Sequence, residues 1–481
     1  MTAAEKTDEY DLIVLGGGAV GENVADRVVQ GGLTAIIVES ELVGGECSYW
    51  ACMPSKALLR SAQALRAAKH VPGAAEAVTG TLDVRAVFER RDSFTSNWSD
   101  AGQVRWLKSA GIDLARGHGR ITGEREVTVS DADGAERVLR ARHAVAISTG
   151  SDAVIPPIDG LREAAPWTSQ EATSADSVPE SLAVIGGGVV GVEMATAYAA
   201  LGSKVTLIAR GGLLGGMEPF AGEHVAKGLK ELGVDVRINT ETTSVRRAES
   251  GVTLTLDGGN GSEEIVATEV LAATGRSARS NNIGLDTVGL KSGGWIDTDD
   301  TLRIPGSEWL YAVGDVNGRV LLTHQGKYQA RAAGDVIVAR AKGENVDDAP
   351  WGRHVATADH AAVPQVTFSI PEAGSVGVTE EAARKAGKSV KAVDYNLGWV
   401  AGASLYEDGF SGQARLVIDT DRDVVLGATF VGPEVAELVH AATIAIVGEI
   451  PIARLWHAVP SYPTISEIWL RLLETYGRDS A

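Results

Sequence analysis

Both cysteines of the 481-residue sequence lie in one short stretch, GGECSYWACMPSK, at Cys47 and Cys52. A chain that uses cysteine nowhere else has little structural need for it, so a close pair after a Gly-rich turn predicts a redox-active disulfide. The alternatives are two unrelated buried thiols or half of a zinc site. Structural zinc takes four ligands, and the sequence has no second cysteine pair, so no metal site is predicted.

Residues 11–40 have the pattern of a strand, a glycine turn, a helix and a second strand. The apolar run DLIVL precedes GGGAVG, which places Gly16, Gly18 and Gly21 in the GxGxxG spacing, and TAIIVE follows as the next strand. The first glycine permits a tight turn, the second lets a pyrophosphate approach backbone N–H groups, and the third lets helix and strand pack closely. Glu39 ends the second strand, where a carboxylate accepts from an adenosine ribose hydroxyl. The alternative is a purely structural glycine turn.

The same unit recurs at 182–210, in LAVIGGGVVGVEMATAYAALGSKVTLIAR. Its turn carries Gly186, Gly188 and Gly191 in the same spacing, followed by a helix and the strand KVTLIA. Two dinucleotide-binding units in one chain predict two bound dinucleotides.

The second strands of the two units end differently. The first ends in Glu39, which suits a free ribose diol, and the second ends in Ala209-Arg210, with no carboxylate at the position that selects NAD. Arg210 can pair with a 2′-phosphate, which favours NADPH and leaves NADH possible. The alternative is a solvated surface arginine, since no second basic residue follows closely.

Composition limits the partners and the location that the sequence allows. The length suits about three domains, and a net charge of −19 argues against nucleic acid or an anionic membrane as the main partner. The first ten residues, MTAAEKTDEY, lack the basic and apolar regions of a secretion signal. Apolar windows such as 182–202 are interrupted by charge, so no membrane span is predicted. We expect a soluble, cytoplasmic protein.

Together these motifs resemble those of the flavoprotein pyridine nucleotide–disulfide oxidoreductases, such as dihydrolipoamide dehydrogenase, glutathione reductase and mercuric reductase. The cysteine stretch resembles the redox-active CxxxxC of that family. The other matching motifs are ISTGS (147–151), AATGR (272–276), YAVGDV (311–316) and VPQVTFSIPEAGSVG (363–377). The first two resemble the crossover turns and carry Gly150 and Gly275. The third resembles the second flavin motif, whose aspartate, here Asp315, holds the ribityl chain, and the fourth resembles the entry to the dimerisation domain.

The resemblance implies an α/β fold with two doubly wound dinucleotide-binding domains, one for FAD and one for NAD(P), plus a C-terminal α/β dimerisation domain. The FAD domain would comprise 1–152 and 281–350, interrupted by the NAD(P) domain at 153–280. The dimerisation domain would comprise 351–481 and form a homodimer.

The resemblance also implies a route for electrons, from NAD(P)H to the flavin and from the flavin to the disulfide. Cys52 would lie against the flavin ring as the charge-transfer thiolate, and Cys47 would be the exposed thiol that attacks an acceptor. Lys56 and Glu193 match a buried ion pair beside flavin N5. Thr323 is a candidate N-cap of the helix after the second flavin motif, whose positive end would favour electron-rich flavin.

The sequence departs from this family near its C-terminus. Members that handle dithiols have a histidine before Pro-Thr, contributed by the other subunit, and a glutamate five residues later. Here the segment is HAVPSYPTISE, so Glu467 keeps its place and Tyr462 replaces the histidine. A phenol with a pKa of about 10 is a poor base at neutral pH. His457, five residues upstream, is interpreted as structural or solvated.

The interior of the cysteine loop also departs from the family. Tyr49 and Trp50 stand where relatives have small or aliphatic residues. They either narrow the access to Cys47 or pack beneath the flavin domain, and the sequence does not separate the two.

The predicted function is an FAD-dependent oxidoreductase that passes electrons from NADPH through the cysteine pair to a disulfide or another small acceptor. The alternatives are a quinone or diaphorase-type reductase and a divergent dihydrolipoamide dehydrogenase, against which Tyr462 argues. A mercuric reductase would carry a C-terminal cysteine pair, which LETYGRDSA lacks. A flavin-binding role without catalysis would leave the cysteine pair unused.

Overall fold

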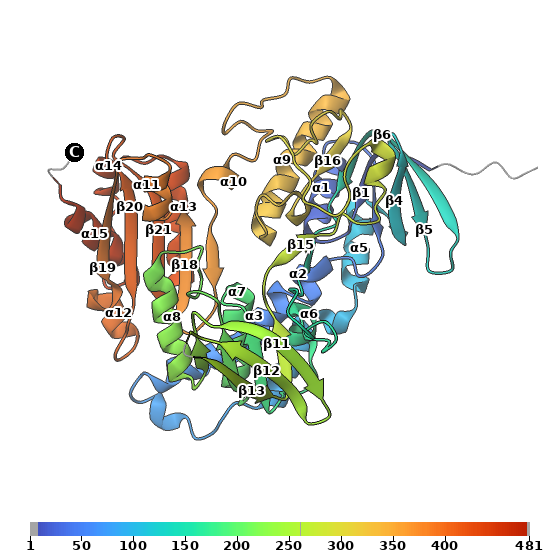
Figure 1. Cartoon of the computed structure of the whole chain (residues 1–481). Helices are drawn as coiled ribbons and strands as arrows, with labels where there is room; N and C mark the ends of the chain where they lie inside the picture. The colour runs from blue at the N-terminus through green and yellow to red at the C-terminus, as the bar shows by residue number, and fades with distance from the viewer. Residues whose placement is uncertain (1–7, 260, 479–481) are drawn as a thin grey trace, which may run out of the picture. The chain divides into compact units, whose positions relative to one another are not determined.

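The computed structural model describes residues 8–259 and 261–478. The chain forms two compact units (Figure 1). The first consists of the described parts of Met1–Pro54, Asp92–Asp152 and Arg276–Asp359. The second consists of the described parts of Ser55–Arg91, Ala153–Gly275 and His360–Ala481.

The first unit is built on a mixed sheet of order β3-β2-β1-β6-β5-β4, with β16 pairing β6. Pairs among β1, β2, β3, β6 and β16 are parallel, and β4 and β5 add an antiparallel edge. The strands are β1 (Asp8–Leu15), β2 (Ala35–Glu39), β3 (Asp113–Arg116), β4 (His118–Gly123), β5 (Glu126–Ser130), β6 (Glu136–Ile147) and β16 (Leu310–Ala312). The run Leu12–Val14 in β1 is fully buried, as expected of a parallel strand covered on both faces.

Two helices of this unit, α1 (Ala19–Gln30) and α9 (Thr323–Lys342), pack along each other. Their close approach depends on small residues, because a Cβ added to Gly326 would collide with the side chain of Val20. Further helices are α2 (Gly45–Tyr49) and α5 (Ala101–Ala110). Helix α1 therefore places the N-terminus of α9 close to the first glycine turn.

The second unit contains the repeated glycine turn. A parallel sheet has the order β10-β9-β8-β14, and an antiparallel sheet has the order β11-β12-β13. The strands are β8 (Ser181–Ile185), β9 (Lys204–Ile208), β10 (Asp235–Arg237), β11 (Glu241–Ala248), β12 (Gly251–Asp257), β13 (Ser262–Ala267) and β14 (Glu269–Ala272). Helix α7 (Val189–Ala200) is apolar on nearly all sides and buried, and α8 (Pro219–Glu231) follows β9.

The C-terminal region of this unit is an antiparallel sheet of order β17-β18-β21-β20-β19 with helices α13 and α15 packed on it. The bounds are β17 (Gln365–Thr367), β18 (Glu372–Gly377), β19 (Val390–Asn396), β20 (Gln413–Asp419), β21 (Val424–Gly432), α11 (Glu380–Lys385), α13 (Val439–Val447) and α15 (Ile468–Tyr476). Shorter or connecting elements are α3 (Cys52–Lys69), α4 (Val84–Phe94), α6 (Ser169–Ser174), α10 (Ala358–Ala361), α12 (Ala401–Tyr406), α14 (Ile452–Leu455), β7 (Ser151–Ala153) and β15 (Arg276–Ala278).

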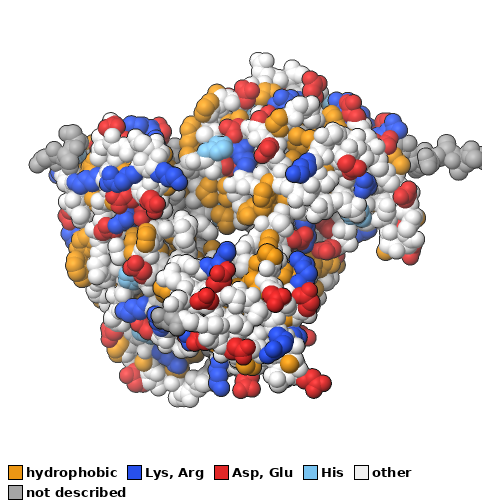
Figure 2. All heavy atoms as spheres, in the orientation of Figure 1, with side chains coloured by type: hydrophobic (Ala, Val, Ile, Leu, Met, Phe, Trp, Pro, Cys, Tyr) orange, Lys and Arg blue, Asp and Glu red, His pale blue; other side chains and the backbone are white. Residues whose placement is uncertain are grey.

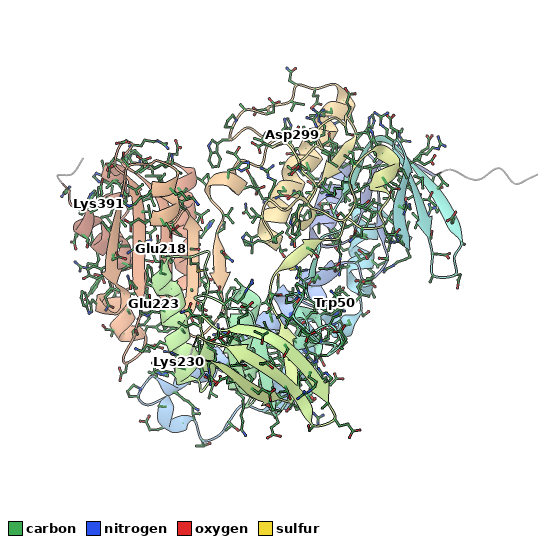
Figure 3. The ribbon with its side chains drawn as sticks, in the orientation of Figure 1. Trp50, Glu218, Glu223, Lys230, Asp299 and Lys391 are labelled. Carbon is green, nitrogen blue, oxygen red and sulfur yellow. The ribbon has the colours of Figure 1, made fainter. Side chains whose placement is uncertain are left out.

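Arg415 of β20 joins helix α8 to the C-terminal sheet. Its guanidinium pairs with Glu218, just before α8, at 3.0 Å, with Glu380 of α11 at 3.3 Å and with Asp394 of β19 at 2.8 Å. Glu218 is buried and also accepts from the backbone N–H of Glu380 at 2.7 Å. Glu218 and the neighbouring Glu223 and Lys230 of α8 are labelled in Figure 3. Gly228 of the same helix lies where a Cβ would collide with the carbonyl oxygen of Ile370.

The structure confirms the predicted fold class of two dinucleotide-binding folds and a C-terminal α/β region. On the face drawn in Figure 2, Asp and Glu side chains are scattered among Lys and Arg. Within residues 8–259 and 261–478, no helix is both long and apolar enough to cross a membrane.

Candidate functional site

The first glycine turn follows β1 and opens helix α1. Gly16 has φ of +101°, and a Cβ there would collide with the carbonyl oxygen of Ser148, so only glycine fits. A Cβ on Gly21 would collide with the carbonyl oxygen of Gly16, which explains the close packing of helix and strand. A Cβ on Gly18, which precedes α1, would meet only the Cα of Gly45, at the ordinary contact distance of 3.8 Å. Gly18, Ala19 and Val20 line a cavity, so the N-terminus of α1 is accessible to an anion.

Glu39 supports this turn from the end of β2. One carboxylate oxygen accepts from the backbone N–H of Gly17 at 2.7 Å, and the other accepts from the N–H of Glu41 at 2.7 Å. The carboxylate is therefore fixed beside the turn, at the place where the sequence predicted a ribose contact.

A cavity of about 340 Å³ extends from this turn. It falls in the size range of small-molecule sites. The predicted site residues that line it are Gly16, Gly18, Glu39, Cys47, Gly150 and Asp315. The helix N-terminus, the fixed carboxylate and a lining that includes both Glu39 and Asp315 fit a dinucleotide such as FAD. The structure thus brings the predicted residues of the first unit together.

Asp315 is held by residues that the sequence did not single out. Its Oδ2 atom accepts a hydrogen bond from Ser151 Oγ at 2.6 Å, and Arg276 Nε donates to the same hydroxyl at 2.6 Å. The guanidinium of Arg276 also pairs with Glu46, just before Cys47 in the cysteine stretch. Arg276 directly follows the crossover glycine Gly275, and this position was the only signal for it in the sequence.

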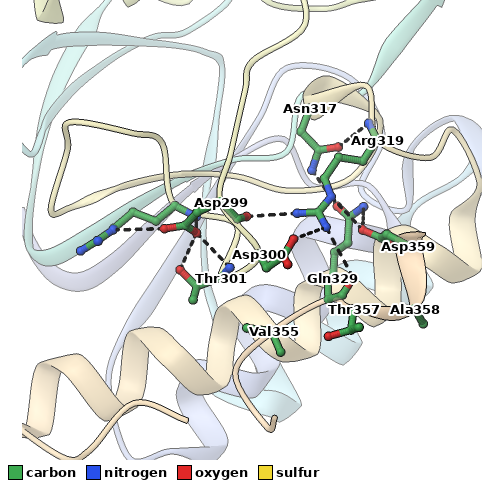
Figure 4. A network of polar contacts seen from close by, with 12 residues as sticks. Asp299, Asp300, Thr301, Asn317, Arg319, Gln329, Val355, Thr357, Ala358 and Asp359 are labelled. Carbon is green, nitrogen blue, oxygen red and sulfur yellow. Dashed lines mark hydrogen bonds and ion pairs between the residues drawn. The ribbon is translucent and has the colours of Figure 1, made fainter. Parts of the chain in front are cut away.

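A polar network fixes the loop that follows Asp315 (Figure 4). Asp359 accepts from the side-chain amides of Gln325 and Gln329, each at 2.9 Å, and pairs with Arg319 at 3.1 Å. The side-chain oxygen of Gln329 in turn accepts from the backbone N–H of Gly314 at 2.8 Å. The start of α9 and the Asp315 loop are thereby tied to one buried carboxylate.

Two consecutive glycines place the cysteine stretch against the first glycine turn. Gly45 has φ of +61°, and a Cβ there would lie 2.7 Å from the Cα of Gly18. Gly44 donates its backbone N–H to the carbonyl oxygen of Gly17 at 2.8 Å. Cys47 then lies in α2, and Cys52 begins α3. This backbone contact fixes the cysteines beside the cavity.

Both cysteines are free thiols in this structure, and both are half-buried. The Sγ atom of Cys52 lies 3.4 Å from the Oγ1 atom of Thr323, the first residue of α9. Sharing a hydrogen bond with Cys52, together with burial, raises the pKa of the Cys47 thiol. Burial and the contact with Cys52 therefore favour the neutral thiol form of Cys47.

The prediction that Thr323 is the N-cap of α9 is wrong. The cap position belongs to Leu322, whose backbone is extended, with φ of −138° and ψ of 131°. The hydroxyl of Thr323 stands one residue inside the helix, where it reaches Cys52 instead.

Tyr49 and Trp50, in the loop between the cysteines, were expected either to narrow the access to Cys47 or to pack beneath the flavin domain. Tyr49 is buried, donates its hydroxyl to the carbonyl oxygen of Val43 at 3.0 Å, and its own carbonyl accepts from Trp98 Nε1 at 3.2 Å. Tyr49 therefore packs beneath the loop. Trp50, labelled in Figure 3, is half-buried, and its ring lies 5.8 Å from that of Tyr49.

Lys56 and Glu193 form the predicted ion pair. The Nζ atom of Lys56 lies 2.7 Å from Glu193 Oε2, and the Glu193 side chain is only 3% exposed. The other carboxylate oxygen accepts from the backbone N–H of Phe368 at 3.0 Å, and the ammonium lies 5.2 Å from the Phe368 ring centre. The carboxylate is therefore satisfied on both oxygens.

The second glycine turn repeats the arrangement of the first. A Cβ on Gly186 would collide with the carbonyl oxygen of Ala273, a Cβ on Gly191 would collide with that of Gly186, and the space at Gly188 is open. The cavity beside this turn has a volume of about 610 Å³. Its lining includes Gly186, Gly188, Arg210, Gly275 and Glu241. Arg210 is exposed, and Glu241 was not recognised in the sequence.

The candidate site residues near the C-terminus differ in how far they are exposed to solvent. Tyr462 is 76% exposed, and His457 is also exposed. Glu467 is buried, with Oε1 accepting from Arg471 at 3.1 Å. In the part of the chain that the structure describes, Glu467 Oε2 has no hydrogen-bond partner. Across the same described ranges, no group of three or more His, Cys, Asp or Glu side chains is arranged to hold a metal ion.

Comparison with known proteins agrees with this geometry. Residues 10–334 match the family model described as pyridine nucleotide-disulphide oxidoreductase, and residues 363–472 match the dimerisation domain of that family. The chain is 33% identical to dihydrolipoyl dehydrogenase of Thermus scotoductus, over 95% of each chain. It is 31% identical to mercuric reductase of Streptomyces lividans, over 98% of this chain and 97% of that one.

A solved structure shows the same fold. The HOCl-induced flavoprotein disulfide reductase RclA of Escherichia coli superposes with a TM-score of 0.80 at 22% identity, over 97% of this chain and 99% of that one. The chain therefore belongs to the pyridine nucleotide–disulphide oxidoreductase family and is a flavoprotein oxidoreductase of the kind that binds FAD and uses NAD(P)H.

Proposed function

We propose that electrons from NADPH reach the Cys47–Cys52 pair through FAD and leave through Cys47 to a disulfide or another small acceptor. The observation that carries this proposal is the position of the cysteine pair. Cys47 lines the same cavity as Gly18 and Asp315, and Cys52 contacts Thr323 at the start of α9. FAD in this cavity would supply the two-electron step between nicotinamide and disulfide.

The chain's own residues then perform the exchange. Cys47 loses its proton as it attacks a sulfur of the acceptor disulfide; a mixed disulfide forms, and the first acceptor sulfur leaves as a thiol that carries this proton. The Cys52 thiolate attacks Cys47, which restores the Cys47–Cys52 disulfide and releases the second acceptor thiolate. Lys56, four residues after Cys52, forms an ion pair with Glu193, and we assign this pair a position beside N5 of the bound flavin. An ammonium paired with the buried Glu193 carboxylate supplies a fixed positive charge there.

The assigned nucleotide preference is for NADPH. Arg210 is exposed and lines the second cavity, so it is free to pair with a 2′-phosphate. Glu241 lines the same cavity and opposes a phosphate there by charge. The preference therefore depends on Arg210 outweighing one carboxylate.

The assigned assembly is a homodimer formed by the C-terminal region. Several large apolar side chains of this region are exposed in the single chain, namely Trp399, Leu405, Ile444, Val459 and Tyr462. Burying them against a second copy would remove this apolar surface from water. In that dimer, the partner subunit's Tyr462 would line the acceptor site at Cys47.

A divergent dihydrolipoamide dehydrogenase is the second candidate, supported by the relatives of that name. Tyr462 opposes it, because a phenol does not accept a proton readily at neutral pH. A quinone or diaphorase-type reductase would take electrons directly from the flavin and leave the cysteine pair unused.

Anaerobic reduction of the purified protein with NADPH tests the proposal. Two-electron reduction should produce a long-wavelength charge-transfer band, and mixing with a panel of disulfides, quinones and Hg(II) should identify the acceptor that removes it. If a Cys47→Ser variant instead turned over quinones as fast as the wild-type protein, the result would favour a quinone or diaphorase-type reductase.

A further inference from the structure

Glu22 is a half-buried residue on helix α1 that the proposed electron route does not use. It follows Gly21 directly, and its Oε1 atom is buried without a hydrogen-bond partner among the residues that the structure describes. Burial raises the pKa of Glu22 to about 7, with Glu39 adding to the rise and Lys327 opposing it. The carboxyl group therefore changes charge close to neutral pH.

Lys327 lies one turn into helix α9, four residues after Thr323. Residues four apart share a helix face, so the face of α9 that presents Thr323 to Cys52 Sγ at 3.4 Å also carries Lys327. The Lys327 ammonium and the Thr323 hydroxyl both act to lower the pKa of the Cys47 thiol, against the larger effects that raise it. A cation thus stands close to the cysteine pair.

Helix α1, the start of α9 and the cysteine stretch pack closely together, with glycines at the points of contact. Gly326, next to Lys327, packs on Val20 of α1, and Gly45 of the cysteine stretch packs on Gly18. Such contacts leave little room for the segments to shift. The distances between Glu22, Lys327 and the cysteine pair are therefore set by the packing.

We propose that Lys327 stabilises the thiolate of the reduced cysteine pair, and that Glu22 sets how much of the Lys327 charge is available to it. The inference rests on the proposed redox role of Cys47 and Cys52. Neither Glu22 nor Lys327 touches the acceptor; both act through the cysteine pair, as positioning residues. Two electrons and one proton convert the disulfide into one thiolate and one thiol, so reduction places a new negative charge close to Lys327.

The sign of the effect follows from the charge of Glu22. Below about pH 7 the carboxyl group is neutral, and the whole charge of Lys327 favours the thiolate. Above pH 7 the carboxylate offsets Lys327, and the thiolate becomes more basic and more nucleophilic. The other charged or titratable groups facing Glu22 are Glu39 of β2 and Tyr49 of α2, and burial raises the pKa of Tyr49 to about 12. The same phenol is also close to Asp100, which precedes α5.

The experiment uses the holoenzyme, reduced anaerobically with one equivalent of NADPH and titrated between pH 5 and 9. The apparent pKa of the thiolate is read from the charge-transfer band and, independently, from the rate of alkylation by iodoacetamide followed by mass spectrometry. Lys327→Met should raise this pKa by about one unit, which is typical for loss of a nearby opposite charge. Lys327→Arg should keep the wild-type value. Glu22→Gln should not raise it, and should remove an inflection near pH 7 from the alkylation-rate profile.

Lys342→Met is the matched control, because it removes the same residue type from the exposed far end of α9. At 1.5 Å per residue it lies about 22 Å further along the helix, so the titration should not change. A Lys327→Met titration equal to wild type would overturn the inference, and so would a Glu22→Gln profile that keeps the inflection. A wild-type protein without a charge-transfer band would contradict the proposed function, while the alkylation titration would still decide the role of Lys327.

Discussion

Asp359→Asn is expected to loosen the loop that carries Asp315. The carboxylate is 1% exposed, and it accepts from Gln325 and Gln329 while neutralising Arg319. Asparagine has nearly the same shape, but it offers one acceptor oxygen and turns an amide toward groups that are themselves donors. The substitution therefore removes charge and hydrogen bonds without creating a cavity.

The size of the effect follows from what remains around Arg319. Removing one partner of a buried ion pair costs about 3–5 kcal/mol. The guanidinium keeps an exposed pair with Asp300 at 2.8 Å and a hydrogen bond to the carbonyl oxygen of Asp299 at 3.0 Å, both drawn in Figure 4. Because these contacts remain, we expect the free energy of local opening to fall by about 3 kcal/mol, the lower end of this range. This loss corresponds to a roughly 100-fold change in the local opening equilibrium.

Hydrogen exchange followed by mass spectrometry measures this local opening. Peptides that contain residues 312–330 should exchange roughly 100-fold faster in Asp359→Asn. FAD should dissociate more readily from this variant, because the same loop carries Asp315. Asp300→Asn is the matched control: its side chain is 48% exposed, and an exposed pair contributes only about 0–1 kcal/mol. Equal exchange in the two variants, or a change below about fivefold in Asp359→Asn, would refute the reasoning.

Three further substitutions test the assigned roles. Cys52→Ser should abolish the charge-transfer band while FAD stays bound, and a band that persists would remove the role of Cys52. Arg210→Ala should raise the KM for NADPH by roughly 10- to 100-fold, as expected for loss of a charge-assisted contact of about 1.5–3 kcal/mol, and leave NADH nearly unchanged; equal losses would mean that Arg210 does not read the phosphate. Tyr462→His should increase dihydrolipoamide oxidation in stopped flow between pH 6 and 9, because Glu467 can orient the imidazole and general base catalysis contributes about 10²- to 10⁴-fold. Fast wild-type turnover through a group that titrates near neutrality would point to another base, such as His457.

The sequence predicted the parts of the site that local sterics determine. The first and third glycines of both turns were recognisable because their positions admit no Cβ, as the contacts at Gly16 and Gly186 show. The Lys56–Glu193 pair was found by resemblance, and the structure brings the two side chains to 2.7 Å.

The parts that the sequence did not reveal depend on contacts between distant segments. Ser151 and Arg276 surround Asp315 only after the crossover segments meet it, and neither residue type is unusual in sequence. The position of Tyr49 depends on two hydrogen bonds that the sequence does not show. Its hydroxyl donates to the carbonyl oxygen of Val43, and its own carbonyl accepts from Trp98 Nε1. The N-cap of α9 was misplaced by one residue because a threonine beside an apolar residue suits either position.

The cluster around Arg415 limits how far this chain can be treated as a set of interchangeable modules. Its partners Glu218 and Glu380 come from the nucleotide-binding segment and from the C-terminal region, and Gly228 must stay small where it meets Ile370. In a chimera that exchanged residues 153–275 for the matching segment of a relative, the relative's residues would replace Glu218 at Arg415 and Gly228 at Ile370. Unless they preserved the carboxylate and the glycine, Arg415 would lose a buried partner and α8 would be pushed off the C-terminal sheet. Changing the coenzyme preference of this protein is therefore better done by substitutions inside the second cavity than by exchange of the whole segment.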